Sequence, residues 1–157
     1  MQTSYWLMKS EPTSYSIDQL QKDKTTFWNG VRNYQARNFM RDEMKVGDGV
    51  LFYHSNADPS GIAGMAKIVK AGYPDHTQFD AKSPYYDPKA TAQNPIWFMV
   101  DMAFVRKFKN FLELDLLRHA PGLENMMVLK RGSRLSVQPV TTREFEIISK
   151  LGGNSEK

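Results

Sequence analysis

Residues 46–69, VGDGVLFYHSNADPSGIAGMAKIV, hold two apolar runs separated by a polar loop. The first run, Val50 to Tyr53, follows a turn at Gly47–Gly49, and the second run is Ile62 to Val69. Apolar runs of this length between turn residues predict consecutive antiparallel strands. Gly64 lies inside the second run, which indicates a bulge or a tight corner. This stretch therefore predicts a β-structured core.

Further strands and helices are predicted on both sides of that stretch. Apolar runs that end at turn residues predict three more strands, at Tyr5 to Lys9, Ile96 to Val105 and Leu135 to Val140. Capping residues and apolar residues three or four apart predict helices after Ser16, over Tyr34 to Met44, over Leu114 to His119 and after Thr141. Strands and helices do not alternate regularly, which argues against a doubly wound parallel sheet. We therefore predict an α+β fold, a small mixed β-barrel with flanking helices.

The chain has 157 residues, of which 41% are hydrophobic and 24% charged, as is usual for one folded domain. We expect this domain to span residues 1–153, followed by a frayed tail at 154–157. The absence of cysteine excludes disulfides, thiolate nucleophiles and zinc ribbons. The longest apolar run, Ile96 to Val100, is too short to cross a bilayer, and the N-terminus lacks the pattern of a secretory signal. These features predict a cytoplasmic protein with no membrane partner.

The charge balance and the motif content bear on the class of function. The chain carries 21 Lys and Arg against 17 Asp and Glu, a net charge of +4, which favours nucleic acid as a partner only slightly. It contains no glycine-rich phosphate loop, no serine-hydrolase elbow and no HExxH zinc motif. The histidines, His54, His76 and His119, lack the spacing of metal ligands. We therefore predict no metal and no cofactor.

Trp28-Asn29-Gly30-Val31-Arg32-Asn33-Tyr34 is the most informative polar stretch. Trp28 offers a face on which a base can stack, Asn33 a donor and an acceptor for a base edge, and Arg32 a fork for phosphate. The alternative interpretation is a loop at a helix start whose Trp28 fills the core. We favour a binding role for the set, and expect Trp28→Ala to abolish base discrimination without changing the melting curve.

Two strand ends and the last strand carry similar side chains. Lys9-Ser10-Glu11 ends the first strand and supplies an ammonium, a hydroxyl and a carboxylate. These groups suit ligand recognition or acid–base work, and they are also common at a solvated strand end. Because neighbours on a strand alternate faces, we expect that the three do not all face one site. Tyr53-His54-Ser55 follows another strand, and Ser136 and Gln138 alternate with apolar residues in the last one.

A long loop and a basic cluster complete the candidate regions. Residues 71–95 include four prolines and the pair Tyr85-Tyr86, and loops of this kind are usually functional or mobile. The two tyrosines form a lid or pack the loop down. The densest basic cluster is Lys130-Arg131-Gly132-Ser133-Arg134, which is either a phosphate contact or a solvated turn.

Several of these stretches resemble the EVE domain family, and the resemblance covers essentially the whole chain in order. It rests on Tyr5 to Pro12, Trp28 to Asn38, Gly47 to Ser55, Tyr73 to Asp75 with Gln78 to Asp80, Tyr85 to Lys89 and Arg134 to Val140. The resemblance implies a PUA-like fold, a small β-barrel with helices around it, and the chain is similar to the family's bacterial members. The family's expected role is recognition of modified bases, chiefly modified cytosines in DNA.

The resemblance and the residues together favour a non-catalytic module that holds a flipped, modified base in an aromatic pocket, with DNA favoured over RNA. Flipping costs a few kcal/mol, and stacking offsets much of this cost. The base-binding candidates are Trp28, Asn33, Tyr53, Ser10, His54, Ser55, Ser136 and Gln138, and the phosphate-binding candidates are Lys9, Arg32, Arg37, Lys130 and Arg131. Two other hypotheses stay open. One is an ASCH-like amidohydrolase that acts on modified nucleosides through Lys9, Ser10 and Glu11, and the other is an RNA-binding PUA-like module.

Overall fold

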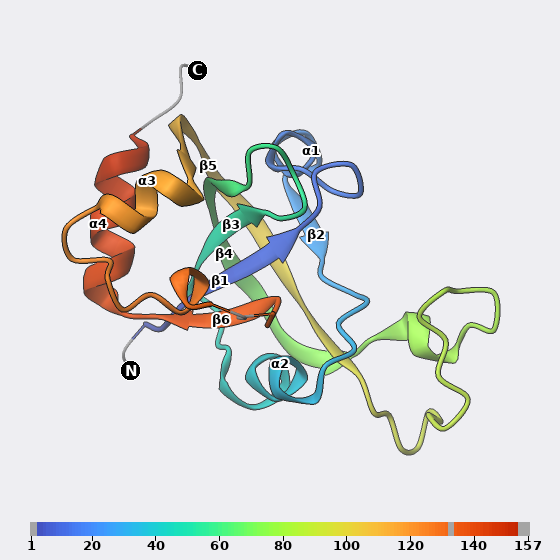
Figure 1. Cartoon of the computed structure of the whole chain (residues 1–157). Coiled ribbons are helices and arrows are strands. Elements are labelled where there is room, and N and C mark those ends of the chain that lie inside the picture. Colours follow the sequence, from blue (N-terminus) through green and yellow to red (C-terminus); the bar gives the residue numbers. More distant parts are fainter. Residues whose placement is uncertain (1–2, 132–133, 154–157) are drawn as a thin grey trace.

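The computed structural model describes residues 3–131 and 134–153, and the predicted tail at 154–157 lies outside these ranges. Its centre is a six-stranded sheet with the strand order β2-β5-β4-β3-β1-β6 (Figure 1). The strands are β1 (Tyr5–Ser10), β2 (Thr25–Phe27), β3 (Gly49–His54), β4 (Gly61–Pro74), β5 (Phe98–Glu113) and β6 (Val137–Val140). The α-helices are α1 (Ile17–Asp23), α2 (Tyr34–Asn38), α3 (Leu114–His119) and α4 (Thr142–Gly152), and the shorter helical segments are η1 (Phe39–Glu43), η2 (His76–Phe79) and η3 (Met127–Leu129).

The sheet is mixed. β1 and β3 run parallel, whereas the other neighbouring strands are antiparallel. β3 and β4 form the antiparallel pair that the sequence predicts. The register between β4 and β5 shifts between Ile62 and Gly64, and a Cβ on Gly64 would lie 2.5 Å from the carbonyl oxygen of Arg106. The irregularity predicted at this glycine is therefore confirmed, because a side chain at that position would collide with the neighbouring backbone.

The α+β class is confirmed, but the predicted barrel is not. Within the described residues no pairing joins the outer strands β2 and β6, so the sheet is open. β5 lies between β2 and β4, as predicted for a central strand. β4 and β5 extend to Pro74 and Glu113, beyond the predicted ends. Their outer parts carry polar residues, which an apolar pattern does not detect.

Helices cover both faces of the sheet (Figure 1). Leu20 of α1 packs in one core cluster with Trp6 of β1, and residues of α2 and η1 join the same cluster. Leu117 of α3 and Ile148 of α4 pack in a second cluster with Leu7. Trp6 and Leu7 are neighbours in β1 and lie in different clusters because side chains alternate faces along a strand.

The helix starts agree with the capping residues seen in the sequence. The Ser16 side chain accepts a hydrogen bond from the Gln19 backbone N–H at 3.1 Å, and Thr141 and Glu144 form a reciprocal capping box. The helix predicted over residues 34–44 divides into α2 and the π-helical segment η1. The wider turn at η1 shows in the Met44 N–H, which donates to the carbonyl five residues earlier at 2.9 Å.

The long loop between β4 and β5 projects from the sheet in Figure 1 and is fixed at its base. Buried Gln78 donates to the carbonyls of Asp75 and Trp97 and accepts from two backbone N–H groups. These four hydrogen bonds satisfy the whole amide. The Trp97 indole also donates to Asp87 at 2.7 Å. The base of the loop therefore has a defined position relative to the sheet.

Candidate functional site

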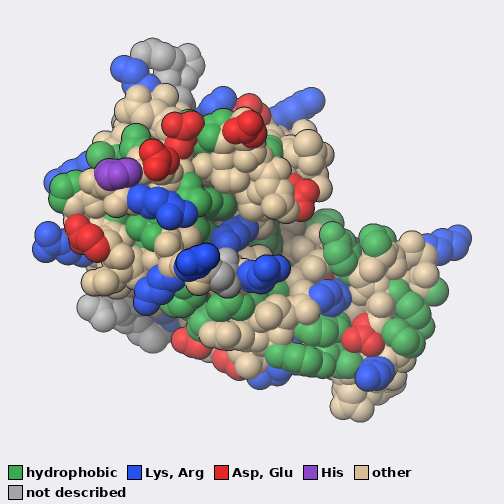
Figure 2. All heavy atoms as spheres, viewed as in Figure 1, with side chains coloured by type: hydrophobic (Ala, Val, Ile, Leu, Met, Phe, Trp, Pro, Cys, Tyr) green, Lys and Arg blue, Asp and Glu red, His purple; other side chains and the backbone are tan. Residues whose placement is uncertain are grey.

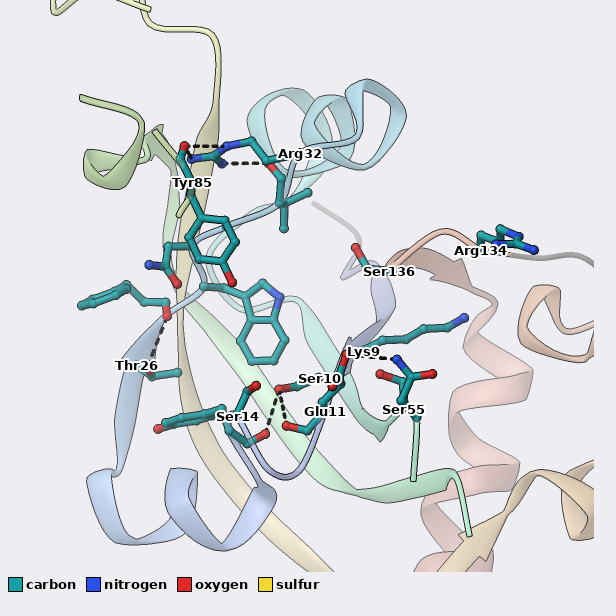
Figure 3. Close-up of a pocket in the computed structure, with 17 residues that line it drawn as sticks. Lys9, Ser10, Glu11, Ser14, Thr26, Arg32, Ser55, Tyr85, Arg134 and Ser136 are labelled. Atoms are coloured by element: carbon teal, nitrogen blue, oxygen red, sulfur yellow. Dashed lines mark hydrogen bonds between the residues drawn. The ribbon is translucent and has the colours of Figure 1, made fainter. Parts of the chain in front are cut away.

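A cavity of about 880 Å³ opens where several strand ends meet (Figure 3). The parallel pairing of β1 and β3 brings the ends of both strands to one edge of the sheet, with Ser10 opposite His54. Ser55 follows β3 at this edge, and its backbone N–H donates to the Ser10 carbonyl at 2.9 Å. Ser136 precedes the antiparallel strand β6, and its carbonyl accepts from the Lys9 N–H at 2.8 Å. Sheet topology alone therefore gathers these polar residues.

Trp28 lines the cavity and is 8% exposed. Its backbone N–H donates to the Val100 carbonyl at 2.8 Å, and its ring meets Phe52 edge-on with 5.5 Å between ring centres. The indole is thus both a wall of the cavity and a part of the core, so the cavity and core interpretations of Trp28 do not exclude each other. The expectation of an unchanged melting curve for Trp28→Ala is therefore withdrawn, because deleting a buried aromatic side chain typically costs about 3–5 kcal/mol of stability.

Tyr85, in the long loop, lies against the Trp28 loop at Gly30. A Cβ on Gly30 would lie 2.7 Å from Tyr85 Cζ, so the ring can occupy this place only beside a glycine. Gly30 also has a φ of +81°, in the region that favours glycine. Tyr85 is 41% exposed and reaches the cavity from the side of the long loop (Figure 3). The cavity therefore has a second aromatic wall.

Arg32 ties these segments together. Each of its five N–H groups has an acceptor: Nε and Nη2 donate to the Tyr85 carbonyl, and Nη1 donates to the Val31 carbonyl and to Asp75. The remaining N–H, on Nη2, donates to Thr77. The guanidinium donors are therefore already engaged, and we no longer assign Arg32 to phosphate.

Asp75 is the buried centre of this arrangement. Its carboxylate accepts from the Gly30 N–H at 2.8 Å, from Arg32 Nη1 at 3.1 Å and from the Thr77 N–H at 2.8 Å. Burial alone would raise the pKa of this carboxyl, but the hydrogen bonds from Thr77, Gly30 and Arg32 outweigh burial and hold the pKa below its ordinary value. The charged carboxylate fixes the Gly30 turn and, through Arg32, the position of Tyr85.

The end of β1 and the turn after it form the side of the cavity opposite Arg32 and Tyr85 (Figure 3). Ser10 Oγ donates to the Tyr15 carbonyl at 2.8 Å, and Glu11 Oε2 accepts from Asn56 Nδ2 at 3.0 Å. Lys9, Ser10 and Glu11 all line the cavity. The side chains of Lys9 and Ser10 still alternate as expected: Lys9 Nζ lies 5.7 Å from the ring centre of Tyr53 in the second core cluster, whereas Ser10 contacts Tyr15 beside the first cluster.

Two cations lie along the cavity. Lys9 and Arg134 line it on the side of Ser136 (Figure 3). Burial lowers the pKa of the Lys9 ammonium. Figure 2 shows further Lys and Arg side chains gathered on the face that carries β1 and β6. This side of the cavity therefore presents positive charge.

Four residues predicted to bind the base lie outside the cavity. Asn33 caps the start of α2 through its side-chain oxygen. Tyr53 is 4% exposed and packs in the second core cluster. His54 Nε2 accepts from a backbone N–H at the start of α1, and buried Gln138 donates to a backbone carbonyl. These groups stabilise the fold, and we no longer assign them to the base. Trp28, Ser10, Ser55 and Ser136 do line the cavity.

Of the predicted phosphate-binding residues, some line the cavity and others do not. Arg37 Nη1 donates to the Ile96 carbonyl at 2.9 Å, and the residue does not line the cavity. Lys130 and Arg131 are both exposed and lie outside the lining as well. Besides Arg32, whose donors are engaged within the protein, Lys9 is the member of the predicted set that reaches the cavity.

Sequence reasoning does not find several residues of the lining. Arg134 belongs to the basic cluster in the sequence, and nothing in the sequence indicates that it lines the same cavity as Trp28. Phe27 is absent from the predicted site, although it is 48% exposed, adjoins Trp28 and lines the cavity. Ser14 and Thr26 also line the cavity. A signal for Phe27 exists in the sequence, since an aromatic residue beside charged and hydroxyl residues is unusual for a core position. Nothing local to the sequence indicates Ser14 or Thr26.

The structure thus defines a small α+β protein whose strand ends surround a cavity with aromatic walls, hydroxyl groups and positive charge. The family model described as the EVE domain matches residues 4–151. The chain belongs to the EVE domain family. In the described part of the chain no helix has the length and apolarity to cross a membrane. The same residues contain no group of three or more His, Asp or Glu that could hold a metal ion.

Comparisons with known proteins agree with this assignment. Human thymocyte nuclear protein 1 is 49% identical over 168 residues, which cover 95% of this chain and 74% of that protein. A solved structure of the human THYN1 protein in complex with 5-methylcytosine-containing DNA is 46% identical, covers 98% of this chain and 100% of that chain, and has a TM-score of 0.87. An ASCH protein of Zymomonas mobilis covers 97% of this chain and 98% of that chain, with a TM-score of 0.55 and 9% identity, a likeness of fold alone.

Proposed function

We propose that this protein is a non-catalytic module that binds a modified cytosine of DNA, flipped out of the duplex into the cavity beside Trp28. The cavity volume of about 880 Å³ falls within the range of about 300–1,000 Å³ that is usual for ligand pockets. The likeness to a human protein solved with 5-methylcytosine-containing DNA supports the choice of base and of nucleic acid.

One observation carries the proposal, namely that aromatic side chains from two distant segments line the same cavity. Trp28 and Tyr85 supply them, and the Asp75–Arg32 contact holds their segments together. Base–aromatic stacking is worth about 1–3 kcal/mol per base, similar to the few kcal/mol that extrusion of a base costs. Because the walls are held in place before binding, little of the stacking energy is lost in ordering them.

The polar lining supplies the other requirements of a base-binding site. The hydroxyl groups of Ser55 and Ser136 and the side chains at the end of β1 are candidates for contacts with the base edge. Arg134, exposed beside the cavity, is a candidate for the phosphate that flanks the flipped nucleotide. Phosphate contacts add affinity without sequence information, so discrimination between bases falls to the cavity.

Equilibrium binding to matched oligonucleotides tests this proposal. Duplexes that differ only in one 5-methylcytosine or cytosine are titrated with the full chain, next to an RNA of the same sequence. One methyl group in an apolar site is worth about 1–3 kcal/mol, so we expect the methylated duplex to bind about fivefold to a hundredfold more tightly. Equal affinity for both duplexes contradicts the proposal. Tighter binding of the RNA supports an RNA-binding module instead.

One observation favours the amidohydrolase alternative, namely that Lys9, Ser10 and Glu11 all line one cavity. A nucleophilic hydroxyl needs a neighbouring base, however, and Ser10 Oγ instead donates to the Tyr15 carbonyl. Incubation of the protein with modified cytidines, followed by chromatography, separates the two functions. Release of a product from the nucleoside supports the enzyme, and saturable binding without product supports the binding module.

A further inference from the structure

We infer that Glu11 reads the edge of the bound base and selects a base with an exocyclic amino group, such as cytosine, over thymine. This inference rests on the proposed function and adds the chemical rule by which the cavity chooses its base.

Glu11 lines the cavity just after the end of β1 (Figure 3). Its backbone is fixed on both sides. The Lys9 N–H donates to the Ser136 carbonyl at 2.8 Å, and the Glu11 carbonyl accepts from the N–H groups of Ser14 and Tyr15, both at 2.9 Å. The carboxylate therefore starts from a defined part of the wall, whereas the Lys9 ammonium lies 5.7 Å from the ring centre of Tyr53, which is outside the cavity.

The Glu11 carboxylate is oriented as well as anchored. Asn56, which follows β3, donates from Nδ2 to Glu11 Oε2 at 3.0 Å. A carboxylate offers about four acceptor sites, so this bond leaves capacity for a ligand. The parallel pairing of β1 and β3 places these two residues together, since each follows the end of its strand.

Glu11 can recognise only a hydrogen-bond donor, because an ionised carboxylate only accepts hydrogen bonds. The pairing edge of cytosine presents an amino donor beside a ring-nitrogen acceptor, and the carboxylate complements the amino donor. Thymine presents a carbonyl acceptor beside a ring N–H, the reverse order. Aromatic walls fix the plane of the base and the sugar fixes its rotation, so the reversed order cannot be matched by turning the base over.

Thymine is an informative competitor because it carries the same 5-methyl group as 5-methylcytosine. A cavity that recognises the methyl group and the ring alone accepts both bases. A cavity that reads the amino group rejects thymine, because the thymine carbonyl would face the Glu11 carboxylate. A carboxylate that accepts from the cytosine amino group is also a common contact in sequence-specific DNA recognition.

The test compares dissociation constants for two duplexes that carry 5-methylcytosine or thymine at one site, each opposite an abasic position. The abasic partner removes the difference in pairing strength between the two bases. We expect the wild-type chain to bind the 5-methylcytosine duplex about fivefold to a hundredfold more tightly, the range of one good base-edge contact. In Glu11→Gln the amide can turn to accept or to donate, so this preference should fall to about twofold or less.

The matched control is Glu146→Gln, which makes the same charge change at an exposed site on α4, away from the cavity. Its preference for 5-methylcytosine should equal that of the wild-type chain. Equal binding of both bases by the wild-type chain, or an undiminished preference in Glu11→Gln, overturns the inference. Failure of the proposed function has a different signature, since the wild-type chain then does not separate 5-methylcytosine from cytosine. Binding of no oligonucleotide overturns both.

Discussion

The ring of Tyr85 lies on Gly30, so close that a Cβ on the glycine would come within 2.7 Å of the tyrosine Cζ. This contact joins the loop after β2 to the loop between β4 and β5. The buried Asp75 carboxylate holds the same two segments, since it accepts from the Gly30 N–H and from Arg32, which in turn donates to the Tyr85 carbonyl. The two aromatic walls of the cavity therefore depend on each other for their positions.

Gly30→Ala should weaken DNA binding by displacing the Tyr85 ring. Gly47→Ala is a close control, because Gly47 has a similar φ of +97° and a Cβ added there would have nothing within 4 Å. Both variants should lose about 1–2 kcal/mol of stability from backbone strain, with a further loss at Gly30 from the collision. Thermal melting and binding titrations check this pair. Equal DNA affinities of the two variants would show that the Tyr85–Gly30 contact is irrelevant to binding.

Tyr85→Ala should remove one stacking wall and leave the fold intact. Loss of a stacking aromatic costs about 1–3 kcal/mol per base, which corresponds to affinity about fivefold to a hundredfold weaker. Tyr86→Ala provides the comparison, since Tyr86 is equally exposed, at 43% against 41%, but does not line the cavity. Isothermal titration with a methylated duplex gives both affinities. A similar loss in both variants contradicts the assignment of Tyr85 as a wall.

Local features of the fold are well predicted from the sequence. The capping residues Ser16 and Thr141 and the irregularity at Gly64 are each decided by a few neighbouring residues, and the structure confirms them. The strand β2 escapes prediction because it has three residues and exists through its pairing with β5. The barrel, predicted from the strand pattern and also implied by the resemblance, is not confirmed, since closure depends on pairing between strands far apart in the chain.

Replacement by alanine should lower the melting temperature at Arg32 and reduce the salt dependence of DNA binding at Arg134. Arg32→Ala removes hydrogen bonds to Tyr85 and Asp75 and should lower the melting temperature, because Asp75 is left buried with fewer partners. Arg134→Ala should leave melting unchanged and reduce the slope of log K against log salt by about 0.9, the value for one phosphate contact. DNA titrations between low and physiological salt measure this slope. A reduced slope in Arg32→Ala with unchanged melting would restore Arg32 as a phosphate contact.

The stability of the protein should fall as the pH drops below the ordinary pKa of histidine, about 6.5. Burial lowers the pKa of His54, and the nearby Lys107 adds to this effect, while Asp18 opposes it. Neutral Nε2 accepts from the Ile17 N–H at 3.1 Å. The unfolded chain takes up the proton more readily than the folded chain. The stability that neutral His54 contributes is therefore fully present above the pKa of the unfolded chain, and it is lost as the pH falls from that value towards the lower pKa of the folded chain.

His54→Gln checks the source of this pH dependence, since an amide oxygen can accept the same hydrogen bond without titrating. Melting temperatures of the wild-type chain and of His54→Gln, taken in steps from about pH 7 to about pH 5, should diverge. The wild-type curve should fall more steeply. Parallel curves would assign the pH dependence to other groups.

The candidate site is harder to predict than the fold. The sequence identifies Trp28 and the end of β1, but it also suggests ligand roles for Asn33 and Arg32 that the structure does not support. A loop that approaches a cavity needs polar side chains to satisfy its own backbone, and these are the same residue types that a ligand needs. Asp75 and Tyr85 show the limit most clearly. Their roles follow from contacts with the Trp28 loop, which no local pattern in the sequence records.

The most direct test of the central claim uses a duplex with one 5-methylcytosine whose methyl carbon is ¹³C-labelled. If the base enters the cavity beside Trp28, the labelled methyl resonance must move on binding and show nuclear Overhauser contacts to aromatic ring protons of Trp28 or Tyr85. We predict both changes at saturating protein. A methyl resonance that keeps its duplex position, without contacts to either ring while the DNA is fully bound, would contradict the account.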